Sequence, residues 1–281
     1  MPAEDEMLRR PLVFSLPEMD RVQAKTDIVY KTIGSVRLAV DLYLPPDVPD
    51  GALTPAVIFI GGDAPEEMTL GPLKQSGQYT GWGRLVAASG LIGIVTNHRS
   101  MHQPPQPYVN LPAVAADIAD MLTFMQERGA SYGIDADHLA LSSFSGGSPF
   151  ALYAALKQRP SFIRCLVAYY GLLDLRHLLT GDQPPEAVAL VSEYSPAAQI
   201  QRQPETVPPF LVARAGLDQA WINQGLDSFV TEALKHNLFL NLLNHPTGQH
   251  AFDILDDNQR SREIIQDTLA FLQRHLKEER A

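Results

Sequence analysis

The chain of 281 residues is poor in cysteine, in clusters of basic residues and in long apolar runs. Its only cysteine, Cys165, lies in the apolar run Cys165-Leu166-Val167-Ala168, which excludes an intramolecular disulfide and predicts a buried structural thiol. No apolar stretch approaches the roughly 20 residues that a membrane-spanning helix needs. The amino terminus, Met-Pro-Ala-Glu-Asp-Glu-Met, is acidic where a signal peptide would be basic. We therefore expect a cytoplasmic protein.

The charge balance is acidic, with 22 lysine and arginine residues against 32 aspartate and glutamate residues and a formal net charge of -10. No basic cluster reverses this charge locally, so phosphate backbones and anionic lipid surfaces are unfavourable partners. We expect neither nucleic acid nor membrane as a partner. A neutral or cationic small molecule is easier to accommodate.

An apolar fraction of 45% is enough for a sizeable core, and the apolar residues alternate between strand-like and helix-like patterns. After an irregular leader over residues 1–24, two strands over 28–32 and 36–43 form a predicted hairpin. The later pattern indicates short buried strands covered by helices on both faces, that is, an α/β fold with a mostly parallel sheet. These strands are expected at 57–60, 91–96, 138–143, 164–169, 210–213 and 238–243. One helix is expected to end near residue 88, and four more are expected at 111–125, 148–157, 221–235 and 264–276.

Prolines interrupt the alternation between residues 171 and 208, where only short helical pieces remain. We interpret this segment as a small inserted cap. The sequence thus predicts a single domain over residues 25–281 with a cap-like insertion at about 171–208.

The most informative motif lies at residues 139–150, which read Leu-Ala-Leu-Ser-Ser-Phe-Ser-Gly-Gly-Ser-Pro-Phe. Ser145 has a small residue two places before it (Ser143) and a glycine two places after it (Gly147). This spacing is typical of a sharp, strained turn between a strand and a helix, from which a serine hydroxyl can attack a substrate. Such strings also arise by chance, but this one follows a buried strand. The motif predicts Ser145 as a nucleophile.

A serine hydroxyl is a weak nucleophile, so Ser145 needs a base and a carboxylate that orients the base. Asp218 follows the expected strand over 210–213, and His250 lies in a glycine-containing loop after the last expected strand. Because parallel strands end on the same edge of a sheet, these residues can meet there. His245 is the alternative base, Asp227 and Asp253 are alternative acids, and Asp218 could instead cap the following helix.

The chain resembles an α/β-hydrolase of the esterase and dienelactone-hydrolase-like branch over roughly residues 26–280. The order of nucleophile, acid and histidine is the order of that fold. The similar segments are the second strand at 40–46, the third strand with the oxyanion loop at 58–62, the nucleophile turn at 143–147, and the acid and histidine loops at 216–218 and 248–252.

The resemblance implies Ser145 as nucleophile, His250 as general base and then general acid, and Asp218 as the orienting carboxylate. It also implies an oxyanion hole formed by the backbone N–H groups of Gly146 and of Gly62 or Asp63. Dienelactone hydrolases proper use cysteine as the nucleophile, so the serine favours ordinary ester chemistry.

Two positions depart from the pattern of this branch. Many of its esterases have His-Gly-Gly where this chain has Ile60-Gly61-Gly62, and Ser143 replaces a glycine. Asp63 follows the glycine pair, and a carboxylate near the oxyanion hole would oppose the charge that forms there. We therefore expect only the backbone N–H of Asp63 to face the site.

Three further residues, His98, Tyr108 and Trp221, are candidates for the substrate pocket. His98 and His102 have i, i+4 spacing, but Pro104-Pro105 makes a shared helical face implausible, so we expect no metal site. Aromatic residues near strand ends also often serve in packing.

Together these features predict a serine hydrolase that cleaves a carboxylic ester of a small or medium substrate through an acyl-enzyme, without a cofactor. A thioesterase or a peptidase-type acyl hydrolase would use the same residues. A non-catalytic ligand-binding or interaction protein is the alternative from a different class, and such a protein would usually have lost one of the three residues.

Overall fold

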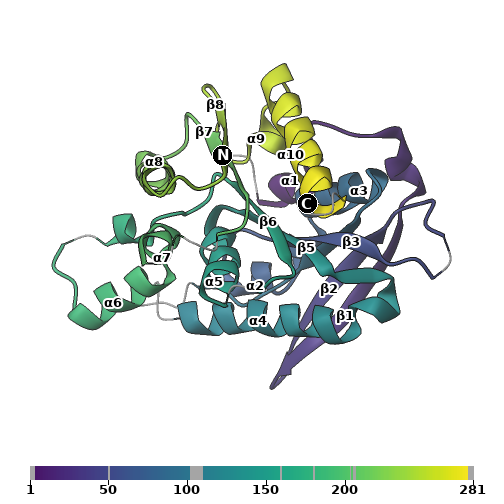
Figure 1. The fold of residues 1–281 in the computed structure, drawn as a ribbon, viewed down its shortest axis with the longest axis horizontal. Helices are drawn as coiled ribbons and strands as arrows, with labels where there is room; N and C mark the ends of the chain where they lie inside the picture. Colours follow the sequence, from purple (N-terminus) through teal and green to yellow (C-terminus); the bar gives the residue numbers. More distant parts are fainter. Residues whose placement is uncertain are drawn as a thin grey trace.

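The computed structural model describes residues 4–49, 51–101, 110–158, 160–179, 181–202, 204 and 207–277. An eight-stranded sheet runs through the centre of the molecule, with helices on both faces (Figure 1). The strand order is β1-β2-β4-β3-β5-β6-β7-β8. The strands are β1 (Gln23–Ile33), β2 (Val36–Leu44), β3 (Thr54–Ile60), β4 (Ile92–Thr96), β5 (Ile134–Phe144), β6 (Ile163–Tyr169), β7 (Phe210–Ala215) and β8 (Leu240–His245).

The sheet has an antiparallel part and a parallel part. β1 pairs with β2 as an antiparallel hairpin, and β2 is also antiparallel to β4. The remaining pairs, from β4 through β3, β5, β6 and β7 to β8, are all parallel. The predicted mostly parallel sheet with an amino-terminal antiparallel hairpin is therefore confirmed.

Several strand boundaries differ from the prediction: β3 and β5 begin at Thr54 and Ile134 rather than at residues 57 and 138, and β1 and β8 differ as well. β1 begins at Gln23 rather than at residue 28, because the strand continues through a register irregularity between Lys25 and Ile28. Asp27, inside this irregularity, has a φ of +57° and donates its N–H to the Asp41 carboxylate. β8 spans Leu240–His245 instead of 238–243, because the N–H of Leu238 still closes the turn after the preceding helix.

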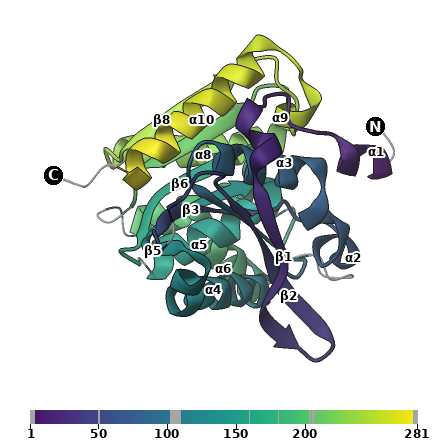
Figure 2. The ribbon, with the colours of Figure 1, turned by 90° about the vertical axis from the view of Figure 1, so that its right-hand side faces the viewer.

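Helices cover both faces of the sheet, and Figure 2 shows α10 on one side and α4 on the other. α3 (Gly77–Ala88) and α10 (Gln259–Lys277) form one layer, and α4 (Leu111–Arg128), α5 (Ser148–Gln158) and α8 (Ala220–Lys235) belong to the other. The shorter helical elements are α1 (Glu4–Arg9), η1 (Pro17–Arg21), α2 (Glu66–Thr69), η2 (Pro72–Gln75), η3 (Gly129–Tyr132), η4 (Ser145–Gly147), η5 (Leu175–Leu178), α6 (Pro185–Tyr194), α7 (Pro196–Arg202) and α9 (Phe252–Leu255).

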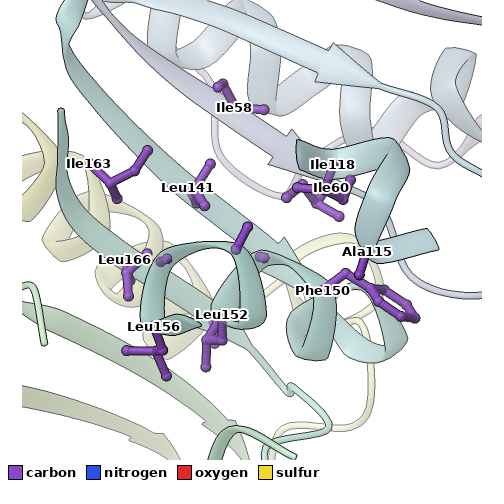
Figure 3. Packing of buried hydrophobic residues seen from close by; sticks show 14 of the residues in the cluster. Ile58, Ile60, Ala115, Ile118, Leu141, Phe150, Leu152, Leu156, Ile163 and Leu166 are labelled. Carbon is purple, nitrogen blue, oxygen red and sulfur yellow. The ribbon is translucent and has the colours of Figure 1, made fainter. Parts of the chain in front are cut away.

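The larger core layer lies between the sheet and helices α4 and α5. This layer includes Ile58 of β3, Leu141 of β5, Ile118 of α4 and Leu152 of α5, which are labelled in Figure 3 and are all fully buried. Burying one such side chain contributes about 1.5–3 kcal/mol relative to leaving it exposed. Because both faces of the central strands are covered, the loops at the carboxyl ends of these strands are where side chains can meet a substrate.

Cys165 lies in β6 and is 0% exposed, which confirms the expected buried thiol. Across the part of the chain that the structure describes, no helix is both long and apolar enough to span a membrane.

Candidate active site

Ser145 follows β5 directly, at the turn that joins this strand to α5. Its φ of +47° is unusual for a residue with a side chain, and such a conformation costs about 1–3 kcal/mol. A Cβ at Gly147 would lie 2.1 Å from the carbonyl oxygen of Gly61, so this position needs glycine. The turn therefore has the strained geometry that the motif predicts.

Asp218 and His250 lie in two loops that are tied to each other. Asp218 follows β7, and His250 follows β8. The N–H of Gly216 donates to the carbonyl of His245 at 2.8 Å, and the N–H of Leu217 donates to that of Gly248 at 2.8 Å. These backbone bonds fix the acid loop against the histidine loop.

The structure brings Ser145, His250 and Asp218 together in one hydrogen-bonded chain. Nε2 of His250 lies 3.0 Å from Oγ of Ser145, and Nδ1 lies 2.6 Å from Oδ2 of Asp218. The Asp218 side chain is 1% exposed and the His250 side chain is 36% exposed. A buried carboxylate that accepts a hydrogen bond from Nδ1–H holds the tautomer whose Nε2 can accept a proton from the serine.

The alternative residues have other partners. His245 is buried, and its Nε2 lies 3.1 Å from Oγ of Ser261. Asp227 forms a salt bridge with Arg214 at 2.7 Å. Asp253 is fully buried and accepts hydrogen bonds from Gln78, Trp82 and Tyr170.

Asp218 does not act as the helix cap, because the residue before α8 is Gln219. Its second oxygen, Oδ1, accepts the N–H of Gln219 at 2.8 Å. This bond and the bond to His250 together fix the orientation of the carboxylate.

The three backbone groups expected in the oxyanion hole have different environments. The N–H of Gly62 donates to the hydroxyl of Tyr79 at 2.7 Å, so it is not free for an oxyanion. A Cβ at Gly146 would lie 3.0 Å from the backbone nitrogen of Asp63, so these two residues are in close contact. Gly146 and Asp63 therefore remain the candidates for the oxyanion hole.

The Asp63 carboxylate is held by residues that follow β4. Its Oδ1 accepts the N–H of Met101 at 2.8 Å and the hydroxyl of Ser100 at 3.1 Å. These bonds offset part of the negative charge that a carboxylate places near the site.

A cavity of about 310 Å³ opens beside Ser145 and His250. Its other lining residues are Asp63, Met101, Gly146, Leu172, Leu178, Gln219, Trp221 and Ile222. Trp221, a predicted pocket residue, thus lines this cavity.

Of the other two predicted pocket residues, His98 does not line the cavity, and Tyr108 lies outside the described residues. His98 is buried outside the cavity lining, with Nδ1 2.7 Å from the carbonyl oxygen of Arg99 and Nε2 3.3 Å from that of Gly61. His98 lies two residues after the end of β4, and its ring nitrogens face these backbone carbonyls. His102 also lies outside the described residues.

Sequence reasoning missed two tyrosines at this site. Burial raises the pKa of the Tyr79 and Tyr170 hydroxyls well above the ordinary value, so both remain neutral hydrogen-bonding groups. Tyr170 directly follows β6, so the rule that located Asp218 and His250 at strand ends could also have located it. No comparable signal marks Tyr79, which lies in the first turn of α3.

Residues 40–224 match the model of the protein family BD-FAE. Esterase LipQ of Mycobacterium tuberculosis is 25% identical over 301 residues, covering 96% of this chain and 68% of LipQ.

Two solved esterase structures share the fold. Est2, a thermophilic esterase of the Planctomycetes species Thermogutta terrifontis, matches with a TM-score of 0.72 and 20% identity over 96% of both chains. Esterase B of Lactobacillus rhamnosis, solved with a tributyrin phosphonate inhibitor, matches with a TM-score of 0.69 and 16% identity over 92% of this chain and 87% of its own. The family match covers more than half of the sequence, and the fold agrees with it. The chain therefore belongs to the BD-FAE family and is an α/β-hydrolase of the esterase type.

Proposed function

We propose that the protein hydrolyses carboxylic esters of small substrates through an acyl-enzyme on Ser145. The observation that carries this proposal is the chain of two hydrogen bonds from Ser145 through His250 to Asp218, at 3.0 and 2.6 Å. His250 accepts the proton of the serine as Oγ attacks the ester carbonyl, and Asp218 stabilises the imidazolium that forms. His250 then returns the proton to the leaving alcohol, and a water that it activates releases the acid.

The tetrahedral intermediate carries a negative oxygen that needs preorganised donors. We assign this role to the backbone N–H groups of Gly146 and Asp63, which are in close contact. The bonds of the Asp63 carboxylate to Ser100 and Met101 help that N–H to serve an anion in spite of the nearby negative charge.

The size of the cavity favours a substrate with a short acyl or alcohol group. Its volume of about 310 Å³ lies at the lower end of the roughly 300–1,000 Å³ of small-molecule sites. Met101, Leu172, Trp221 and Ile222 provide apolar surface there. Related structures agree with this size, since Est2 has been solved with butyrate bound and Esterase B with a C4 phosphonate.

Residues 171–208 are proposed to act as a cap over the site. They contain η5, α6 and α7, and two of their leucines, Leu172 and Leu178, line the cavity. The cap would thus contribute to the choice of substrate.

A fluorophosphonate probe tests the proposed function. Such a probe reacts much faster with an activated serine than with an ordinary hydroxyl, so the wild-type protein should be labelled and Ser145→Ala should not. Est2 has been solved phosphorylated by paraoxon, which shows that this chemistry occurs on the shared fold. A folded wild-type protein that neither reacts with the probe nor hydrolyses p-nitrophenyl butyrate would exclude the proposal.

A further inference from the structure

A second buried carboxylate lies three residues after His250 and has no part in the chemistry proposed above. Asp253, at 0% exposure, accepts hydrogen bonds from Nε2 of Gln78 at 2.9 Å, Nε1 of Trp82 at 2.9 Å and the hydroxyl of Tyr170 at 2.8 Å. Gln78 also donates to the Tyr170 hydroxyl at 2.7 Å. We call Gln78, Trp82, Tyr170 and Asp253 the Asp253 cluster. Burial of a carboxylate costs free energy unless its oxygens accept hydrogen bonds, and here three side chains donate to them.

The Asp253 cluster contacts the catalytic histidine through one aromatic ring. The ring centroids of Tyr170 and His250 are 4.5 Å apart, with an angle of 53° between the planes. The imidazole thus has the Tyr170 ring on one side and the Asp218 carboxylate at Nδ1. A contact of this kind restricts the rotation of the imidazole ring.

Backbone strain is concentrated around this contact. Tyr170 has a φ of +38°, and Ala251, the residue after His250, has a φ of +63°. Non-glycine residues keep such conformations only where the surrounding structure holds them. The Tyr170 hydroxyl is anchored on Asp253, and the carbonyl of Ala251 accepts the N–H of Ile254, the next residue after Asp253.

The first turn of α3 connects this support to the other half of the site. Gln78 donates to the Asp253 cluster, and the adjacent Tyr79 accepts the N–H of Gly62 in the oxyanion loop. One helical turn therefore holds both the histidine support and the loop that precedes Asp63.

We infer that the Asp253 cluster positions His250 for proton transfer, with Tyr170, Gln78 and Asp253 as positioning residues. This inference rests on the proposed function, because it takes His250 as the base. The cluster acts through packing and hydrogen bonds and does not touch the substrate. The N–H of the imidazole is bonded to Asp218, so Asp253 does not replace that carboxylate.

Tyr170→Phe tests this inference, since it keeps the ring against His250 and removes only the hydroxyl that anchors it. Tyr169→Phe is the matched control, because the Tyr169 hydroxyl is equally buried but bonds Thr268 at 2.7 Å. A small misplacement of a catalytic group lowers turnover steeply, so Tyr170→Phe should lower kcat about 10-fold with KM unchanged. Tyr169→Phe should keep kcat near the wild-type value, although it also loses a buried hydrogen bond.

Proton NMR of the Nδ1–H of His250 gives a readout that does not depend on turnover. The hydrogen bond to Asp218 should give this proton a low-field, slowly exchanging signal in the wild type and in Tyr169→Phe. The signal should broaden through faster exchange in Tyr170→Phe. Equal kcat values and equal signals in the two variants would overturn the inference. Failure of the proposed function is a separate result, absence of fluorophosphonate labelling in the wild type, and the NMR comparison would still decide the role of the cluster.

Discussion

At the scale of single residues, the site uses side chains in backbone conformations that such residues rarely adopt. Ser145, Tyr170 and Ala251 all have positive φ values, and each lies in or beside the hydrogen-bonded chain. Each conformation costs about 1–3 kcal/mol, which the packing around it must offset. These backbone conformations set the directions of the serine hydroxyl and of the histidine loop.

The two histidines near the end of β8 should differ sharply in their effect on catalysis. His250→Ala should lower kcat/KM by about 10⁴-fold, because the serine loses its proton acceptor. His245→Ala should lower the melting temperature and keep the turnover of the folded protein, because His245 is buried against Ser261. Hydrolysis of p-nitrophenyl butyrate measures both. Loss of activity in His245→Ala alone would make His245 the base.

Tyr79→Phe should weaken the oxyanion loop. The variant leaves the N–H of Gly62 without its partner, at a cost of about 1–3 kcal/mol, and we expect kcat to fall about 10-fold as the loop shifts. Tyr169→Phe again serves as the control for loss of a buried hydroxyl. An unchanged or higher kcat would show that the freed N–H of Gly62 can serve the oxyanion directly.

At the scale of helices and strands, local patterns were sufficient to locate most elements. Short apolar runs predicted the strands because both of their faces are buried, as at Val57 and Ile58 of β3. The start of β1 was missed because its first residues, from Gln23 to Asp27, are exposed and carry no apolar pattern. The start of β8 was misplaced because the apolar residues Leu238 and Phe239 lie before the strand and not in it.

The part of the site that could be predicted consists of residues that follow strands in a recognisable motif or loop. The Asp253 cluster could not be predicted, because Gln78 and Asp253 lie 175 residues apart and neither belongs to a motif. The Gly62–Tyr79 bond escaped prediction for a similar reason. The sequence around a tyrosine within a helix does not indicate which loop its hydroxyl will contact.

Asp117 of α4 connects three elements and should make stability sensitive to acid. It bonds Lys31 of β1 at 2.8 Å and Arg99, after β4, at 2.7 Å. Burial alone would raise the pKa of Asp117, but the hydrogen bonds from Arg99 and Lys31 outweigh it and hold the pKa below its ordinary value of 3.8. The folded pKa is depressed, so the stabilisation is present above pH 3.8 and is lost as the pH falls through the folded value.

Asp117→Asn should therefore lower the free energy of unfolding at pH 7 by about 3 kcal/mol and flatten its decline in acid. Asp120→Asn is the matched control, because Asp120 contacts the same Lys31 at 2.6 Å but is 53% exposed. That variant should change stability by less than about 1 kcal/mol. Urea unfolding at a series of pH values measures both, and equal losses in the two variants would contradict the prediction.

At the scale of the whole molecule, the parallel sheet assembles residues from distant parts of the chain at one edge. Ser145, Asp218 and His250 follow β5, β7 and β8, and β6 and β7 separate β5 from β8 in the strand order. The whole chain has a formal net charge of -10. None of the described residues that line the cavity is lysine or arginine.

This charge should favour cationic over anionic esters. A small acetate ester with a quaternary ammonium in its alcohol part should show a kcat/KM about 10-fold above that of a carboxylate-bearing analogue at low ionic strength. The ratio should fall toward 1 as salt screens the field of the protein. A neutral ester of the same size is the control, with a kcat/KM that should change little with salt. A constant ratio from 0.01 M to about 0.5 M salt would contradict the prediction.

The buried thiol of Cys165 can report how often the folded protein opens. It is the only cysteine, it lies in β6 near the middle of the sheet, and none of its surface is exposed. A thiol reagent can reach it only when the sheet opens, so the rate of modification in the native state reports that opening without any engineered probe. Comparing this rate with and without an inhibitor bound to Ser145 would reveal how strongly occupancy of the site restrains the centre of the fold.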